Sequence, residues 1–329
     1  LDDDLHPTAC TFLRTLPGVF MRITTATFAA VSACLVVLWA APIGAQELET
    51  RPVPLGQVEA FTFQSPSMGV TFSVSVGLPP GYKAGDGKSY QALISTDGDW
   101  AFSSVNTAAR SLAGVIESPF VISIGTGADE GEALWTRRRI YEFSPPDWDM
   151  KDTFGQLVSK LCADMKTEPS TCVGGAPKFL NVIVSELMPL VSAKYPIDRS
   201  QLGLFGVSAG GFFASWAIFQ PNSPFKKYLI SSPAMAYGDG DIFRQEARYA
   251  KDHTDLPVGI YLAAGVLEAS DADLEGVGRI VSGTAHLAGV LAGRKYPGLT
   301  VVTEFHPGMG HVDVVGTAVV RGLRTLYAR

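Results

Sequence analysis

The stretch Leu202-Gly203-Leu204-Phe205-Gly206-Val207-Ser208-Ala209-Gly210 decides the fold of this chain. Its first four residues are typical of a buried strand, and residues 212–219 after it are typical of a buried helix. The pentapeptide between them has the pattern G-x-S-x-G, which occurs once in the chain. Its glycines let the strand and helix backbones approach closely around a sharp turn, and the serine is left at the tip. The alternative is a glycine-rich turn that merely packs a helix on a sheet. We expect a nucleophile at Ser208.

Apolar runs on both sides of this stretch predict alternating strands and helices. Residues 128–175, rich in Trp, Pro and charge, predict an irregular insertion over one face of the sheet. A mostly parallel sheet with helices on both faces follows, with its site at the carboxyl ends of the strands. The expected strands are 71–78, 90–94, 120–124, 202–205, 228–230, 259–264 and 299–305; the expected helices are 179–195, kinked by Pro189, 212–219, 279–291 and 312–327.

The composition is that of an ordinary globular protein and excludes some partners. The 329 residues are 47% hydrophobic and 18% charged, with a formal net charge of -6. A mildly acidic chain is a poor candidate for binding nucleic acid, because phosphate binding needs clustered Lys and Arg. The dense basic run Arg137-Arg138-Arg139 is best interpreted as a solvated turn or as local ion pairs. We therefore expect no nucleic-acid partner.

The first 45 residues do not resemble part of the fold. Residues 21–45 have a basic start, a short apolar stretch and small residues at the end, as in a secretory signal peptide. An uncleaved membrane anchor is the alternative, although the stretch is short for a span. We interpret residues 1–20 as upstream translation and residues 46–329 as one domain. The chain is then exported, to the periplasm or outside the cell, with no stable membrane anchor.

Removal of residues 1–45 leaves two of the four cysteines, Cys162 and Cys172. An exported protein meets an oxidising compartment, where two such residues can pair. Two free thiols are the alternative, because sequence spacing does not determine geometry.

A serine hydroxyl is a weak nucleophile and needs a base, which in turn needs an acid to orient it. After the last expected strand come His306, at its edge, and His311, behind a flexible Gly-Met-Gly loop. We expect His311 to be the base and His306 to pack or to line the pocket. The acid should follow the strand 259–264, where Glu268 comes first and Asp271 and Asp273 compete with it.

Acyl transfer also needs backbone donors for the oxyanion. One is the amide of Ala209, and the second candidate is the amide of Asp99 in a tight Asp-Gly turn. Trp100 and Phe102 follow that turn and would suit an apolar or aromatic substrate, unless they belong to the core. We expect a neutral or aromatic ester as substrate. The chain contains no H-E-x-x-H pattern and its histidines lack ligand spacing, so neither a metal nor another cofactor is expected.

With these residues in place, the chain over about 60–329 resembles the esterase branch of the α/β-hydrolases. That branch holds siderophore trilactone esterases, feruloyl-type carbohydrate esterases and mycolyltransferase-like enzymes, and the siderophore-esterase-like subgroup is the most similar. The resemblance implies a triad of Ser208, Glu268 and His311, and an ester hydrolase acting on a small molecule. An acyltransferase and a non-catalytic binding protein are the alternatives. The motifs that carry the resemblance are Val76-Gly77-Leu78-Pro79-Pro80-Gly81-Tyr82, Asp97-Gly98-Asp99-Trp100, Glu186-Leu187-Met188-Pro189, Gly206 to Gly211, Ser232-Pro233, Gly265-Val266-Leu267-Glu268 and Gly308-Met309-Gly310-His311.

Overall fold

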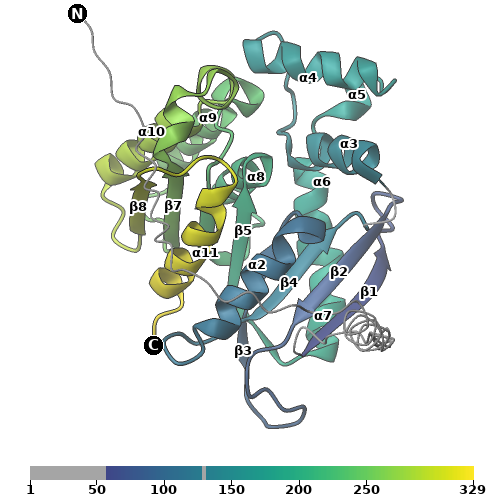
Figure 1. Cartoon of the computed structure of the whole chain (residues 1–329), viewed down its shortest axis with the longest axis vertical. Coiled ribbons are helices and arrows are strands. Elements are labelled where there is room, and N and C mark those ends of the chain that lie inside the picture. Colours follow the sequence, from purple (N-terminus) through teal and green to yellow (C-terminus); the bar gives the residue numbers. More distant parts are fainter. Residues whose placement is uncertain (1–56, 128–130) are drawn as a thin grey trace, which may run out of the picture. The chain divides into compact units, whose positions relative to one another are not determined.

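The computed structural model describes residues 57–127 and 131–329, and these form one eight-stranded sheet (Figure 1). The strand order is β1-β2-β4-β3-β5-β6-β7-β8. The six strands from β4 to β8 are parallel, and β2 runs antiparallel to its two neighbours. The predicted mostly parallel sheet is therefore confirmed. The strands are β1 Val58–Gln64, β2 Thr71–Gly77, β3 Tyr90–Ser95, β4 Phe120–Gly125, β5 Ile197–Val207, β6 Phe225–Ser231, β7 Gly259–Gly265 and β8 Thr300–His306.

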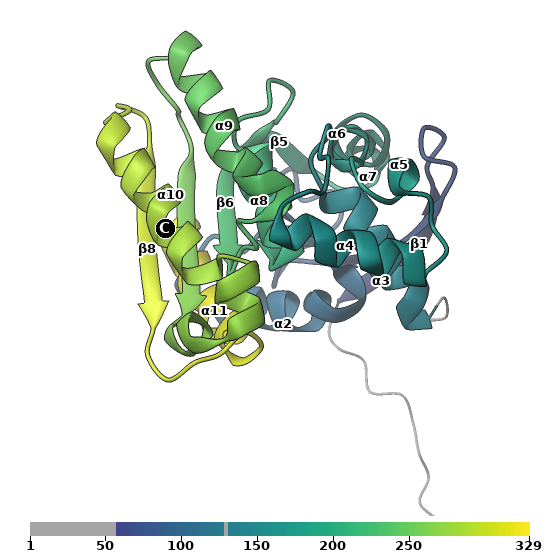
Figure 2. The ribbon, with the colours of Figure 1, turned by 90° about the horizontal axis from the view of Figure 1, so that it is seen from above.

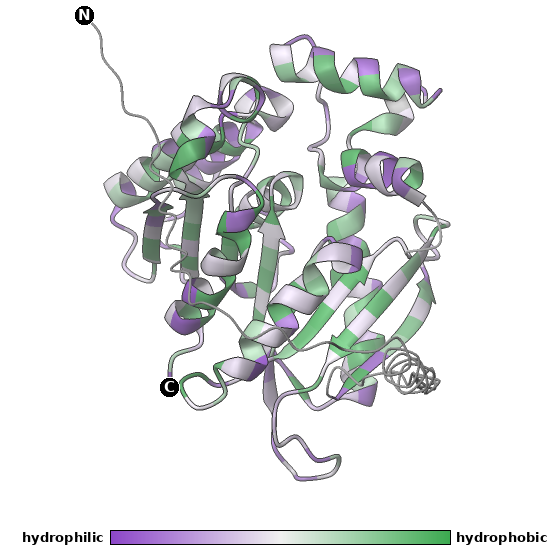
Figure 3. Cartoon of the chain, viewed as in Figure 1, coloured by the Kyte–Doolittle hydropathy of each residue, from purple (hydrophilic) through white to green (hydrophobic). Residues whose placement is uncertain are grey.

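Helices cover both faces of the sheet (Figure 2). One hydrophobic cluster joins α2 and α11 to the first face, and a larger cluster packs α3, α6, α7, α8, α9 and α10 against the second. The central strands are largely apolar, and the helices carry both hydrophobic and hydrophilic residues (Figure 3). The helices are α2 Gly98–Ser111, α3 Gly131–Phe143, α4 Thr153–Asp164, α5 Pro169–Cys172, α6 Ala176–Asn181, α7 Met188–Lys194, α8 Ala209–Ala217, α9 Tyr237–Asp252, α10 Ile280–Arg294 and α11 Asp313–Leu326.

The region expected to be irregular, 128–175, contains the three helices α3, α4 and α5, so that expectation was wrong. In α3 the buried residues include Arg138 and Glu142 as well as Ile140 and Phe143. Two charged residues on the buried side disguise the helical apolar period that sequence analysis searches for. Helices α2 and α9 and strand β1 also went unpredicted.

Where a kink at Pro189 was predicted, the structure has a π-helical turn just before the proline. Helix α6 continues through the π-helical residues Val182–Leu187 into α7, where Pro189 lies in the first turn. Proline lacks an N–H and its ring clashes with the carbonyl one turn earlier. A wider turn just before it accommodates both effects without ending the helix.

Cys162 of α4 and Cys172 of α5 are joined by a disulfide, with their Cα atoms 6.1 Å apart and both side chains fully buried. The bond ties helices α4 and α5 of the insertion together. The signal peptide predicted over residues 21–45 and the upstream stretch 1–20 lie outside the described residues. Within 57–127 and 131–329, no helix combines the length and apolar character needed to cross a membrane.

Candidate active site

Ser208 lies in a strained turn between β5 and α8. Its backbone angles are φ 57° and ψ -120°, a conformation that L-residues rarely adopt. Its N–H donates to Ser231 O at 3.1 Å, and its carbonyl accepts from Phe212 N at 2.9 Å. The half-buried side chain therefore stands at the carboxyl end of β5 and the amino end of α8. Strain of this kind is held only where the surrounding structure enforces it, often at functional sites.

The two glycines of the pentapeptide are required by close approach, as predicted. A Cβ on Gly206 would lie 2.0 Å from the carbonyl oxygen of Gly210. A Cβ on Gly210 would lie 2.5 Å from Thr96 Oγ1. A larger residue at Gly206 would push the start of α8 away from β5, and one at Gly210 would collide with the side chains of Thr96 and Asp97.

Glu268 and His311 are brought together at the same edge of the sheet. His311 Nδ1 lies 2.5 Å from Glu268 Oε1. Because a carboxylate only accepts hydrogen bonds, Nδ1 carries the proton and Nε2 is left as an acceptor. The carboxylate is 1% exposed, and its other oxygen accepts from Ser232 Oγ at 2.8 Å and from Gly265 N at 2.6 Å. Two further donors thus hold the buried carboxylate against the imidazole.

The two loops that carry these residues also pack on each other. Leu267 N donates to Met309 O at 3.0 Å, and a Cβ on Gly265 would come within 2.3 Å of that same oxygen. The competing acid Asp271 plays another role: it is exposed and caps a following turn by accepting from Asp273 N and Leu274 N. Of the three acids considered, Glu268 is the one that contacts His311.

Ser208, Glu268 and His311 share one edge because of the strand order. They follow β5, β7 and β8, which are parallel and separated only by β6. Among the hydrogen bonds of the described residues, none joins Ser208 to His311. Such bonds are often long before a substrate is bound and tighten in its complex.

The loop after β3 differs in detail from the predicted tight turn. Asp97 has the left-handed conformation (φ 55°, ψ 42°), and Gly98 begins helix α2. Gly98 is required by close approach, because a Cβ there would lie 2.8 Å from the Ile124 carbonyl carbon. Asp99 is the second residue of the helix, so its N–H has no acceptor inside the helix and is available to a ligand. Ala209, the first residue of α8, offers its N–H in the same way.

The residues expected to line the pocket have different surroundings. Trp100 is 44% exposed and borders a hollow of about 260 Å³ that Asp99 and Trp135 also line. Phe102 packs against the cluster between α2 and α11. His306 is buried and lies 3.4 Å from the Tyr261 hydroxyl, as the packing alternative predicts.

The basic run lies in α3, where Arg138 forms a local ion pair, as one of the two interpretations predicted, while Arg139 pairs with a residue outside the helix. Arg138 is buried and pairs with Glu142. Arg139 donates to both carboxylate oxygens of Asp97, at 2.5 and 3.1 Å. Burial alone would lower the pKa of Arg139, but the Asp97 carboxylate outweighs it and the pKa is raised. Sequence analysis missed both pairings.

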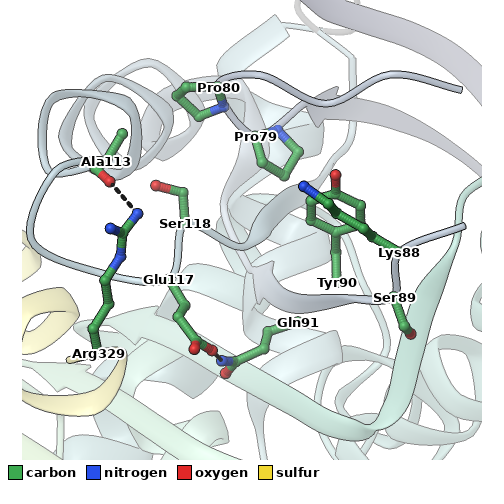
Figure 4. A pocket seen from close by; sticks show the side chains of 10 residues that line it. All are labelled: Pro79, Pro80, Lys88, Ser89, Tyr90, Gln91, Ala113, Glu117, Ser118 and Arg329. Carbon is green, nitrogen blue, oxygen red and sulfur yellow. Dashed lines mark hydrogen bonds between the residues drawn. The ribbon is translucent and has the colours of Figure 1, made fainter. Parts of the chain in front are cut away.

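A second cavity, of about 450 Å³, lies at the opposite edge of the sheet (Figure 4). Its lining includes Tyr90 at the start of β3, Gln91 and Glu117, which are joined by a hydrogen bond of 2.6 Å, and Arg329. Since Ser208 stands at the carboxyl ends of the strands, this cavity is not part of its site. Within the part of the chain that the structure describes, no group of three or more His, Cys, Asp or Glu residues is arranged to hold a metal.

The chain is similar in sequence and in fold to known proteins. The chain is 28% identical over 153 residues to ferri-bacillibactin esterase BesA of Bacillus subtilis (strain 168), covering 46% of this chain and 51% of that protein. It is also 28% identical over 166 residues to a siderophore enterobactin esterase of Emericella nidulans, covering 50% and 52%. The crystal structure of the BES protein from Bacillus cereus superimposes with a TM-score of 0.69 at 21% identity, over 86% of this chain and 99% of that one.

The fold is that of the α/β-hydrolases. The resemblance to siderophore esterases stated from the sequence is confirmed by these relatives. The chain spans about half the length of the curated relatives that it matches. No protein-family model matches the chain.

Proposed function

We propose that the protein is a serine esterase that hydrolyses a carboxylic ester through an acyl-serine intermediate on Ser208. The observation that carries the proposal is the hydrogen bond between His311 Nδ1 and the buried Glu268 carboxylate. This bond leaves Nε2 as a free acceptor at the sheet edge where the strained Ser208 turn lies. A nucleophile, a base and an orienting acid at one edge are the parts that acyl transfer requires.

In the first half of the reaction, Ser208 Oγ attacks the ester carbonyl carbon while His311 Nε2 takes the hydroxyl proton. The carbonyl oxygen becomes an oxyanion, which the N–H groups of Ala209 and Asp99 stabilise. The C–O bond to the alcohol then breaks, and the alcohol leaves with the proton from His311. In the second half, water gives a proton to His311 and attacks the acyl carbon, and Ser208 Oγ leaves with that proton as the free acid is released.

For the substrate, we propose an ester of the siderophore class, because the relatives are named as siderophore esterases. Arg138 and Arg139 are engaged by Glu142 and Asp97, so these two arginines of the run are not free to hold an anionic substrate. Trp100 and Trp135, which line a hollow together with Asp99, suit a flat or apolar group. We therefore favour a neutral or aromatic ester within that class over a highly charged one.

We also propose that the protein is exported and loses residues 1–45. The sequence pattern of residues 21–45 supports this, and so does the Cys162–Cys172 disulfide, because such bonds persist in oxidising compartments.

A fluorophosphonate probe tests the central proposal, since it labels only an activated serine. The wild-type protein should label and Ser208→Ala should not. A panel of acetyl, butyryl, feruloyl and catecholate-lactone esters then ranks substrates by kcat/KM, and an added alcohol acceptor distinguishes hydrolysis from acyl transfer. A folded wild-type protein that neither labels nor hydrolyses any of these esters would refute the proposal.

A further inference from the structure

The loop that carries the Asp99 amide is held at both ends by hydrogen bonds to other elements. On one side, the Asp99 carboxylate accepts from Thr126 N at 2.7 Å, from Thr126 Oγ1 at 3.0 Å and from Gly127 N at 2.9 Å, at the end of β4. On the other side, Thr96 N donates to Phe205 O at 3.1 Å. Between these anchors lies Asp97 in the left-handed conformation, which sets the direction in which α2 begins.

The Asp97 side chain is itself fixed by Arg139. The guanidinium of Arg139 donates from Nε and Nη2 to the two carboxylate oxygens. A lysine ammonium, which is a point charge, does not reproduce this bidentate pair. Asp97 is 4% exposed. The guanidinium also lies over the ring of Trp135, with 4.5 Å to its centroid. Helix α3 thus holds Asp97 through a contact between residues that are 42 positions apart.

The same carboxylate reaches the turn that follows the nucleophile. A Cβ on Gly210 would lie 3.0 Å from Asp97 Oδ2, so the carboxylate stands against the first turn of α8. Asp97 therefore lies close to both proposed oxyanion donors. Asp99 follows it by two residues, and Ala209 precedes Gly210, the residue against which the carboxylate stands. An unpaired negative charge here would repel an oxyanion that forms at Ser208, and Arg139 cancels that charge.

We propose that Arg139 is a positioning residue for the oxyanion hole, which acts through Asp97 and does not bind the substrate. The inference rests on the proposed esterase function. Two effects follow from the pair: the amide of Asp99 is held in its direction, and the charge of Asp97 is neutralised where negative charge develops. Both concern the transition state more than the bound substrate, so a loss should appear in kcat and not in KM.

The test compares Arg139→Met and Arg139→Lys with wild type. The substrates are p-nitrophenyl butyrate, which is neutral, and p-nitrophenyl hemisuccinate, which is anionic. Arg139→Met should lower kcat by about 10- to 100-fold for both esters, because removal of one oxyanion donor outright costs about 10²- to 10³-fold and misplacement costs less. KM should stay within about threefold for both esters. Arg139→Lys keeps the charge without the fork and should recover part of the loss.

A transition-state analogue gives an independent measure. Ser208 adds to the carbonyl carbon of a trifluoromethyl ketone and forms an oxyanion. The affinity of each variant for this inhibitor should therefore fall in parallel with its kcat. Arg138→Lys is the matched control, because Arg138 also forms a buried ion pair in α3 but contacts Glu142 and the Thr71 carbonyl instead of the loop. It should leave kcat within about twofold. Arg137→Met on the exposed side of the same helix should change neither kcat nor stability.

Several results would overturn the inference. A rise in KM for the anionic ester alone, with kcat unchanged, would make Arg139 a substrate-binding residue. A kcat for Arg139→Met within about threefold of wild type would remove the positioning role. Should Arg139→Met fail to fold, Arg139→Lys decides the matter, since a kcat equal to that of Arg138→Lys contradicts the inference. A wild-type protein without labelling or hydrolysis refutes the proposed function and the inference together, whereas a labelled wild type with unchanged variants refutes the inference alone.

Discussion

Replacement of Glu268 by Gln is the most informative single change at the candidate site. All three partners of this carboxylate are donors in the structure: His311 Nδ1, Gly265 N and Ser232 Oγ. A Gln side chain has one oxygen and one NH₂ group, so it cannot accept on both sides. Two orientations of the amide are available, and each has a different cost.

In the first orientation the amide oxygen faces His311 and the NH₂ group faces Gly265 N, 2.6 Å away in the wild type. Two donors then oppose each other in a buried place, at a cost of about 1–3 kcal/mol. In the second orientation the oxygen keeps Gly265 N and Ser232 Oγ, and the NH₂ group faces the imidazole. His311 then carries its proton on Nε2 and cannot take the proton of Ser208.

Because the first orientation costs about 1–3 kcal/mol, most molecules adopt the second. Only about one molecule in 5 to 150 then keeps the proton of His311 on Nδ1, which is the tautomer that can act as a base. Loss of the carboxylate charge, which stabilises the imidazolium, removes about another 1.5–3 kcal/mol, or roughly 10- to 100-fold. We therefore expect Glu268→Gln to lower kcat by about 10² to 10⁴ with little change in KM.

The assay is hydrolysis of p-nitrophenyl acetate, with circular dichroism to show that the variant is folded. Asp271→Asn is the control: Asp271 is exposed, and Asn caps a helical turn about as well as Asp. It should keep kcat within about twofold. A larger loss for Asp271→Asn than for Glu268→Gln, or a Glu268→Gln turnover within about tenfold of wild type, would contradict the tautomer argument.

Three further predictions concern the nucleophile, the base and the disulfide. Ser208→Ala should lower p-nitrophenyl acetate turnover by several orders of magnitude in a folded protein, and a loss of less than about tenfold would rule out this nucleophile. His311→Ala should abolish turnover, whereas His306→Ala, which alters a buried contact with Tyr261, should mainly affect substrate affinity or stability; the opposite ranking would move the base to His306. Intact mass with and without reductant and alkylation should show a chain that begins near residue 46 and a Cys162–Cys172 bond, and alkylation of both cysteines without reductant would count against that bond.

The catalytic residues were open to prediction because each is marked by local sequence. The Ser208 turn needs glycines at two positions within five residues, and the geometry explains both. Glu268 and His311 each follow a strand whose apolar run is short and recognisable. Parallel strands bring their carboxyl ends to one edge, so chain order was enough to group these residues.

The supporting residues were not open to prediction, for a physical reason. Arg139 and Asp97 are 42 positions apart, and their pairing depends on how α3 packs against the sheet. Buried and solvated ion pairs also look the same in a sequence, because a charged residue type does not show whether its side chain is buried. The same holds for Arg138 and Glu142, whose charges concealed the whole helix from the periodicity analysis.

These buried pairs bear on the substrate as well. Arg138 and Arg139 are each matched by a carboxylate, so α3 brings no net charge from these residues toward the site. Beside His311, by contrast, the loops expose aliphatic side chains: Val312 is 76% exposed, and Leu267 and Val266 are also exposed. Exposed aliphatic groups next to a reactive histidine gain free energy when an apolar ligand covers them, at roughly 25 cal/mol per Å². Leu267→Asn and Val312→Asn should therefore lower kcat/KM for aromatic esters more than for acetyl esters, and an equal loss for both would show that these side chains do not contact the substrate.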